Sequence, residues 1–200
     1  MNKTKKCFKR FEGSFFSVKI KSGVGMKYYC RYFSSTFSIL LISDDECLLE
    51  LKLNADPSSD VMENQNLEVF QKTRKWLDDY FQGQKPSIKI PLKMQGTDFQ
   101  KEVWNILLEI PYGQVVTYGY LANLIARKRN IPKMSSQAIG NALHQNPIPI
   151  IVPCHRVIGK NKNLVGYGLG MDLKIKMLKL EGMDLQGYYF YEDKNKKFVE

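Results

Sequence analysis

The pattern of apolar and β-favouring residues in the first half of the chain predicts three β-strands. In segment 48–53, leucine alternates with polar residues, as in a half-buried strand. Two further β-rich segments, 28–33 and 37–42, precede it and are separated by short serine and aspartate turns. We expect the three strands to form an antiparallel meander.

A helical pattern follows these strands. Asn66 is expected to be its N-cap, and Gly83, with Pro86 shortly after it, is expected to end it. Apolar residues between these positions recur at helical spacing and share one face: Leu67, Phe70, Leu77, Tyr80 and Phe81. Strands and helix together predict a small α/β unit.

The character of the chain changes after a linker at 82–94, so we place a domain boundary near residue 90. Thr97 and Gln100 have the spacing of a capping box and predict a helix that runs to the turn at 111–113. The second half of the chain is therefore expected to open with a helix.

Two short helices are then predicted around a basic turn. Thr117 is expected to cap a helix at 118–126, and Ser135 or Ser136 another that continues through Leu143. A helix, a turn and a second helix that reads the groove form a common DNA-binding arrangement. Helical hairpins are also frequent in other proteins, so the pattern alone leaves both interpretations open.

The composition is that of an ordinary globular protein. Of the 200 residues, 44% are hydrophobic and 12% aromatic, which excludes intrinsic disorder and collagen-like repeats. The sequence has no apolar run of the roughly 18 residues that a transmembrane helix needs and no signal-peptide core. Four cysteines without CxxC spacing are typical of reduced thiols. We expect an intracellular protein that binds no membrane, in the cytoplasm or, in a eukaryote, in the nucleus.

The net charge of +10 is unevenly distributed. Basic and acidic residues number nine and one in 1–31, six and ten in 32–90, twelve and six in 91–185, and three and three in 186–200. Clustered cations favour binding to a polyanion such as DNA. A solvated basic surface is the alternative interpretation.

Three prolines between 147 and 153 exclude a helix before Cys154. They hold an apolar segment extended, so that the thiol is presented at the end of a rigid, largely buried segment. Cys154 is then either a nucleophile or a structural thiol of the core. His155 and Arg156 favour a nucleophile, because such neighbours lower the pKa of a thiol. Neighbours in an extended segment point to opposite faces, so a water would have to connect Cys154 with His155.

Neither histidine has the partners that a metal site needs. His144 and His155 lack a second ligand at the spacing of a tetrahedral zinc site, and Cys7 and Cys30 have no histidine near them. We expect no metal and no cofactor. A papain-like hydrolase would need a histidine far from the cysteine in sequence, and His144 is the sole remote candidate.

Several short motifs occur in a fixed order: Ile110-Pro-Tyr-Gly113, Thr117-Tyr-Gly119, Ala138-Ile-Gly140, Asn146-Pro147, Pro153-Cys-His-Arg-Val157, Gly166-Tyr167 and Leu180-Glu-Gly182. Through them, residues 95–182 resemble the O6-alkylguanine-DNA alkyltransferases, and 28–90 resemble that family more weakly. The resemblance implies an α/β (α+β) fold class, with an RNase H-like N-terminal α/β domain followed by a winged helix-turn-helix C-terminal domain. We divide the chain into a basic extension (1–27), these two domains (28–90 and 91–185) and a C-terminal tail (186–200).

The same resemblance implies DNA repair by direct reversal. An alkyl group would move irreversibly, in a single turnover, from O6-alkylguanine to Cys154, with O4-alkylthymine as a further candidate substrate. The damaged base lies inside the duplex and has to be flipped out. Glu181 would orient His155, which would act on Cys154 through water. Tyr118 would donate to the departing purine, and Asn146 would tie the turn beside the active-site segment.

The resemblance also implies which residues bind the DNA and the flipped base: Gln137, Ala138, Arg156, Tyr167 and Gly168. In the family an arginine of the reading helix fills the gap left by the flipped base. Gln137 stands at that position without the charge or stacking plane of a guanidinium, so we expect weaker insertion. Leu169 stands where the family usually has glycine and is expected to disfavour bulky adducts, unless it points to solvent.

The expected partner is double-stranded DNA that contains alkylated guanine, bound by a monomer. Two other functions stay open. A non-catalytic lesion-binding protein of the same fold would flag the damage for another pathway, but the intact Pro-Cys-His-Arg motif around Cys154 argues against it. A winged-helix transcription regulator would explain the basic reading helix but not the cysteine segment.

Overall fold

A computed structural model describes residues 25–34 and 37–199. Most of the predicted basic extension, including Cys7, lies outside the described residues. The strands are β1 (Lys27–Phe33), β2 (Ser38–Ser43), β3 (Leu48–Leu53), β4 (Val61–Glu63), β5 (Val116–Thr117), β6 (Val157–Ile158), β7 (Tyr189–Glu192) and β8 (Asn195–Phe198). The helices are α1 (Glu68–Phe81), α2 (Asp98–Glu109), α3 (Tyr118–Lys128), α4 (Ser136–His144) and α5 (Met171–Leu180), with a 3₁₀ turn at Cys154–Arg156.

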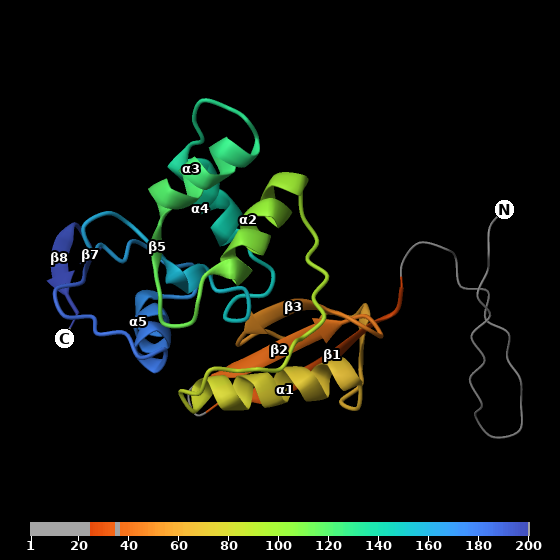
Figure 1. The fold of residues 1–200 in the computed structure, drawn as a ribbon. Coiled ribbons are helices and arrows are strands. Elements are labelled where there is room, and N and C mark those ends of the chain that lie inside the picture. The colour runs from red at the N-terminus through yellow and green to blue at the C-terminus, as the bar shows by residue number, and fades with distance from the viewer. Residues whose placement is uncertain (1–24, 35–36, 200) are drawn as a thin grey trace, which may run out of the picture.

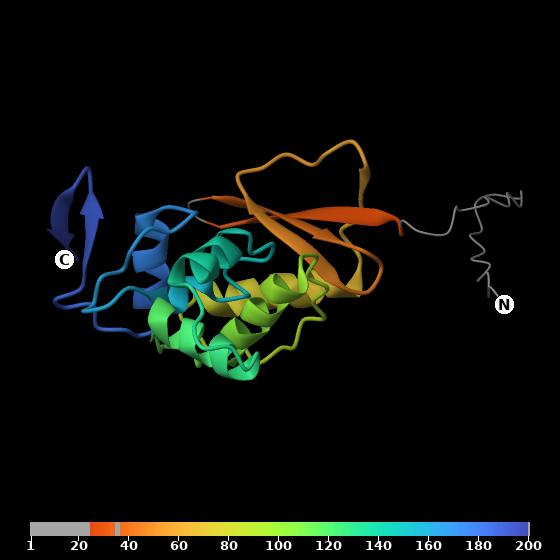
Figure 2. The ribbon, with the colours of Figure 1, turned by 90° about the horizontal axis from the view of Figure 1, so that it is seen from above.

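The first part of the chain is a sheet covered by one helix. The sheet has the order β3-β2-β1-β4, and β1, β2 and β3 are antiparallel neighbours, so the predicted meander is confirmed. Helix α1 lies along this sheet (Figures 1 and 2) and buries Phe70, Leu77 and Tyr80. Strand β4, parallel to β1, was not predicted because its three residues are exposed or half-buried and too few to show a pattern.

One predicted helix cap is wrong. The N-cap of α1 is Leu67 rather than Asn66, and it makes no side-chain capping bond to the described residues. The amide of Asn66 instead donates to Oδ1 of Asn64, at 3.1 Å, in a local turn that competes with the cap. The predicted end of α1 at Gly83 is confirmed. Gly83 has a φ of +76°, and its amide donates to the carbonyl of Tyr80.

The three other predicted caps are confirmed. Thr97 and Gln100 form a reciprocal capping box at the start of α2. Thr117 and Ser135 each accept a backbone hydrogen bond at the starts of α3 and α4. Helices α3 and α4 form the expected helix-turn-helix, although α3 continues two residues beyond the predicted end at 126.

One continuous apolar core joins the sheet, α1 and the helices α2 to α4. The indole of Trp104 on α2 donates to the carbonyl of Ala142 on α4, at 2.8 Å. The amide of Leu51 in β3 donates to the carbonyl of Pro147, also at 2.8 Å. Strand β3, at the edge of the sheet, is thus hydrogen-bonded to the segment that leads to Cys154. Since the two predicted domains share these contacts, the domain boundary near residue 90 stays a prediction.

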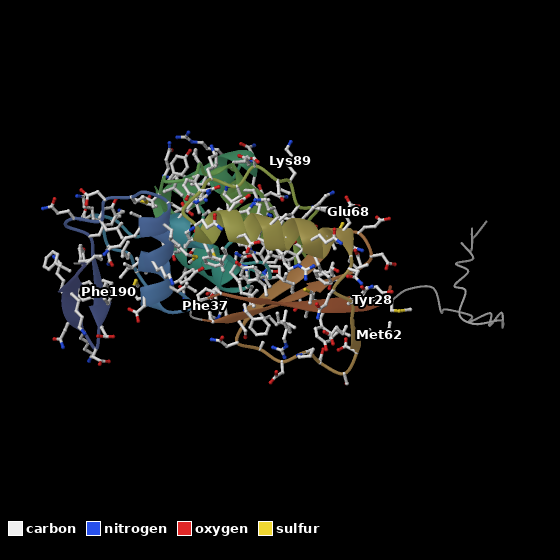
Figure 3. The ribbon with its side chains drawn as sticks, turned by 90° about the horizontal axis from the view of Figure 1, so that it is seen from below. Tyr28, Phe37, Met62, Glu68, Lys89 and Phe190 are labelled. Atoms are coloured by element: carbon white, nitrogen blue, oxygen red, sulfur yellow. The ribbon has the colours of Figure 1, made fainter. Side chains whose placement is uncertain are left out.

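The C-terminal part holds two elements that the pattern did not reveal. Helix α5 leads to Glu181, and residues expected to be a tail form the hairpin β7–β8. The hairpin, which includes Phe190, lies at the opposite end of the molecule from Tyr28 and Met62 (Figure 3). Among the described residues, no helix combines the length and apolarity needed to cross a membrane.

Candidate active site

A cavity of about 390 Å³ opens beside α4, and Cys154 lies in its wall. The full lining is Tyr118, Gly140, Leu143, His144, Asn146, Pro149, Cys154, Gly166, Tyr167, Gly168 and Leu169. The structure therefore brings together Cys154, Tyr118, Asn146, Tyr167 and Gly168 from four separate stretches of sequence. Leu169 belongs to the lining rather than pointing only to solvent.

Two of the residues expected to bind DNA lie outside this cavity. Gln137 is exposed on the first turn of α4. Ala138, half-buried, lines a neighbouring groove together with Phe99 and Asn141. Both residues thus lie on the helix expected to read the groove, beside the cavity mouth.

The backbone at Cys154 is a 3₁₀ turn, and the segment before it turns at Ile150, whose φ is +74°, so the prediction of an extended segment that ends at Cys154 is wrong. The prolines exclude an α-helix before the cysteine, but they do not prevent this short turn after Pro153. The side chain of Asn146 fixes the turn: its Nδ2 donates to the carbonyl of Val152 at 2.8 Å and to Sγ of Cys154 at 3.1 Å, while Oδ1 accepts from the amide of Ile148.

Burial raises the pKa of the Cys154 thiol above its ordinary value. Hydrogen bonds from Asn146 and with Tyr167, together with the charge of Lys174, act in the opposite direction. We expected His155 and Arg156 to have this effect, but their side chains are engaged with Glu181 instead. The thiol is therefore protonated near neutral pH and needs a proton acceptor before it can attack.

Glu181 is the centre of a buried hydrogen-bond network. Its Oε1 accepts from the hydroxyl of Tyr80 at 2.8 Å and lies 2.7 Å from Nε2 of His155. Its Oε2 accepts from Nε of Arg156 at 2.8 Å and from the amide of Gly113 at 3.1 Å. Burial alone would raise the pKa of Glu181, but the hydrogen bonds from His155 and Arg156 lower it to about 2. Glu181 is a carboxylate at physiological pH.

His155 is fully buried, and this burial lowers its pKa. The imidazole is therefore neutral, and the carboxylate of Glu181 favours the tautomer that carries its proton on Nε2. Nδ1 is then the acceptor nitrogen. It has no hydrogen-bond partner within the described part of the chain. The network thus leaves one basic nitrogen available in the residue that follows Cys154.

Arg156 does not lie where a DNA-binding residue would. Its side chain is buried, its guanidinium donates to both oxygens of Glu181, and Nη1 donates to the carbonyl of Ile110 at 2.7 Å. With its donors used inside the protein, it cannot reach a phosphate or a base. The prediction of a DNA contact is corrected to a role in holding Glu181.

Sequence reasoning missed two residues of the site. Tyr80 of α1 contacts Glu181 and lies 3.3 Å from Nε2 of His155. The sequence offered one signal for Tyr80: a tyrosine on the apolar face of a helix is expected to be buried, and its hydroxyl then needs a hydrogen-bond partner. Lys174 of α5 is fully buried and donates to the carbonyls of Val157 and Leu164, at 2.7 and 2.6 Å. Burial lowers its pKa to about 8. The sequence offered a signal for Lys174 as well: it lies at helical spacing from the apolar Met177 and Leu178, and therefore on the same face of a helix.

Within residues 25–34 and 37–199, no group of three or more histidine, cysteine, aspartate or glutamate side chains is placed to hold a metal ion. The described site therefore consists of a thiol, a histidine–glutamate pair, two buried cations and three tyrosines. Such a set can carry out nucleophilic attack by sulfur with proton transfer through the imidazole.

Comparison with known proteins gives two matches to family sequence models, which together span most of the chain. Residues 27–94 match the ribonuclease-like domain of 6-O-methylguanine DNA methyltransferase, and residues 98–183 match the DNA binding domain of the same family.

Individual relatives agree with these matches. The methylated-DNA–protein-cysteine methyltransferase of Methanosarcina acetivorans is 44% identical over 160 residues, which cover 78% of this chain and 98% of that protein. The protein of the same name from Haemophilus influenzae is 40% identical and covers 77% and 86%. Among solved structures, Mycobacterium tuberculosis OGT in complex with DNA is similar with a TM-score of 0.67 and 35% identity, over 77% of this chain and 92% of that one. The chain therefore belongs to the 6-O-methylguanine DNA methyltransferase family, with its ribonuclease-like domain and its DNA-binding domain.

Proposed function

We propose that this protein repairs DNA by moving the alkyl group of O6-alkylguanine onto Sγ of Cys154. The observation that carries the proposal is the position of Cys154 in the wall of a cavity beside the reading helix α4, next to a buried histidine–glutamate pair. A duplex that lies against α4 would deliver a flipped base into this cavity. The relative solved in complex with DNA supports DNA binding.

Activation of the thiol follows from the hydrogen-bond network. Glu181 holds the proton of His155 on Nε2, so that Nδ1 takes the proton of Cys154 through a bridging water. The imidazolium that forms is stabilised by the adjacent carboxylate. The thiolate that forms accepts the hydrogen bond from Asn146 and lies in the field of Lys174. Glu181 and Arg156 are positioning residues here, and Cys154 and His155 are catalytic.

The transfer itself is an in-line displacement. The S–C bond forms while the bond between the alkyl carbon and O6 breaks, and the guanine leaves with that electron pair. Tyr118, in the cavity wall, donates a hydrogen bond toward the departing purine, and the proton that His155 took from Cys154 finally balances the negative charge of the released guanine. Burial raises its pKa, as does the negative charge that develops at Cys154, so its hydroxyl stays a donor at neutral pH. The lesion supplies the alkyl group, and no cofactor takes part.

The product is a thioether, which offers no good leaving group for a second transfer. Each molecule therefore reacts once. We propose that it acts as a monomer on double-stranded DNA with alkylated guanine, in the compartment that holds the DNA, the cytoplasm or the nucleus. O4-alkylthymine is a second candidate substrate, because it presents an alkylated oxygen in a similar place.

The proposal is tested by mass spectrometry after incubation with a duplex that contains one O6-methylguanine. We expect one added methylene per protein molecule, located by peptide mapping at Cys154, and none in Cys154→Ala. Cys47→Ala, which removes a thiol outside the cavity, is the matched control and should be methylated like the wild type.

The same measurement separates the alternatives. Retention of the lesion duplex with no change in mass, in the wild type, would identify a lesion-binding protein. Binding without preference for the lesion would identify a regulator. Either outcome overturns the proposal.

Replacing Gln137 with arginine is expected to tighten binding to the lesion duplex by about three- to tenfold. The exposed position on α4 would then offer a charge and a planar group that can stack in the gap left by the flipped base. Binding is measured by fluorescence anisotropy at fixed salt, with Gln137→Lys as a control that adds the charge without the plane. If neither variant binds more tightly, Gln137 does not occupy that gap.

Replacing Leu169 with glycine is expected to raise the rate of transfer from O6-benzylguanine about tenfold relative to the rate from O6-methylguanine. Leu169 lines the cavity, so its removal makes room for a larger alkyl group. Leu169→Met, which conserves volume, should leave this ratio close to that of the wild type. Equal ratios in all three proteins would show that Leu169 does not limit the alkyl group.

A further inference from the structure

The C-terminal hairpin β7–β8 holds the segment that leads into the cavity loop. It lies beyond residue 183, where the match to the family's DNA-binding domain ends. The amide of Leu164 donates to the carbonyl of Tyr189 at 2.7 Å, and the amide of Tyr189 donates to the carbonyl of Lys162 at 3.1 Å. Nζ of Lys162 donates to the carbonyl of Gln186 at 3.2 Å. The hairpin is thus hydrogen-bonded to residues that directly precede the cavity loop 166–169.

Leu164 is held from both sides. Its amide is bound by the hairpin, while its carbonyl accepts from the buried ammonium of Lys174 at 2.6 Å. Its side chain is fully buried with Ile158, Leu178 and Leu185. Tyr188, Phe190 and Val199 from the hairpin segment pack against this small cluster. The backbone position of Leu164 therefore depends on the hairpin as well as on α5.

The next residue needs such support. Val165 has a φ of +58°, a left-handed conformation that is costly for a β-branched side chain. The amide of Val165 donates to Oδ1 of Asn163 at 3.0 Å, and its side chain is 36% exposed. A strained residue keeps its conformation only where its surroundings impose it. Here the fixed Leu164 sets the direction in which Gly166, Tyr167 and Gly168 enter the cavity wall.

We propose that the hairpin β7–β8 is a clamp that holds the cavity loop 166–169 in place and so selects the size of the alkyl group that reaches Cys154. This inference rests on the proposed alkyl transfer. Tyr189 acts through Leu164 and is a positioning residue. While the hairpin holds the loop in the cavity wall, Tyr167 and Leu169 contact a small alkyl group on the base. Once released, the loop would make room for larger groups and place a methyl group less well.

The test compares the wild type with a chain that ends at Gly187. Rate constants for transfer from O6-methylguanine and O6-benzylguanine are measured in single turnover and normalised to the fraction of Cys154 that reacts. For the shortened chain we expect the methyl rate to fall about tenfold and the benzyl-to-methyl ratio to rise about fivefold. Affinity for the lesion duplex should stay within about twofold. Asn195→Ser, at an exposed side chain of the hairpin, is the matched control and should behave like the wild type.

Hydrogen exchange gives a readout that needs no substrate. The amide of Leu164 loses its acceptor, the carbonyl of Tyr189, in the shortened chain. We expect the amide of Gly170, which donates to the carbonyl of Tyr167 in the cavity loop, to exchange at least about tenfold faster as well. Should the shortened chain fail to fold, Tyr189→Pro in the full chain removes the donor to Lys162 and takes its place in both experiments. A full-length protein that accepts no methyl group would refute the proposed function and still leave the clamp testable by exchange.

Two outcomes overturn the clamp. If the melting temperature or the reactive fraction falls while the exchange of the Gly170 amide and the benzyl-to-methyl ratio stay unchanged, the hairpin only stabilises the fold. If affinity for the duplex falls with the ratio unchanged, the hairpin is a DNA contact.

Discussion

Replacing Glu181 with glutamine is expected to slow methyl transfer to Cys154 by about 10²- to 10⁴-fold. The carboxylate accepts five hydrogen bonds, from Tyr80, His155, Gly113 and twice from Arg156. An amide presents one oxygen and one NH₂ group, so at least one of these donors would face another donor inside the protein. The tautomer of His155 would no longer be fixed, and Arg156 would be buried without its counter-charge.

Single-turnover rates on a methylated duplex check this prediction, and Tyr80→Phe is the control. That variant removes one donor and keeps the carboxylate, so we expect a loss of about tenfold or less. If Glu181→Gln transferred methyl groups at the wild-type rate, proton transfer through His155 would have to be abandoned.

Glu181 also makes the stability depend on pH. Its pKa of about 2 lies below the ordinary 4.5, so the folded state favours the ionised form. The stabilisation is fully present above pH 4.5 and disappears as the pH falls through 2, and its size is about 3 kcal/mol. Glu181→Gln should lack this part of the acid transition in urea titrations at several pH values.

Replacing Lys174 with methionine is expected to slow methyl transfer by about ten- to a hundredfold. The ammonium ties Val157, three residues after Cys154, to Leu164, and its charge favours the thiolate of Cys154. Methionine fills a similar volume without donors or charge. A rate equal to that of the wild type would show that neither the tie nor the charge contributes.

The pH dependence of stability gives an independent check on Lys174. Its pKa of about 8 in the folded state lies below the ordinary 10.5, so the unfolded chain binds the extra proton between these values. The stability of the wild type, relative to Lys174→Met, should therefore rise by about 3 kcal/mol from pH 8 to 10.5. A difference that stays constant over this window would mean that Lys174 keeps an ordinary pKa.

The sequence predicted elements best where one local signal suffices. The capping box of α2 and the caps of α3 and α4 depend on side chains a few residues apart, and all are present. Of the meander strands, β3 shows the alternation of a half-buried strand, whereas β2 is a continuous apolar run that is buried on both faces. Helix α5 and the hairpin β7–β8 were missed because their apolar patterns are short: the residues of α5 are divided between the main core and a small separate cluster, and those of the hairpin cover only that cluster.

The site was predictable where a motif places residues close together in sequence. Cys154, His155 and Asn146 were found in this way. Tyr80 was not, because it lies 101 residues from Glu181 and nothing local announces their contact. The role of Arg156 was misjudged for the same reason: only the fold shows that its partner is a buried carboxylate rather than a phosphate.

The contact between Tyr80 and Glu181 makes the two halves of the chain chemically interdependent. A fragment from residue 95 to the end would contain all the short motifs, from Ile110 to Gly182, that carry the resemblance to the family. It would lack α1, however, and with it the hydroxyl that donates to Glu181 and the ring that packs edge to face against His155, with centroids 6.4 Å apart. Water would then reach His155 and Glu181 and weaken the hydrogen bond between the imidazole and the carboxylate. A gene fragment with a complete set of signatures can therefore encode a protein with little or no activity.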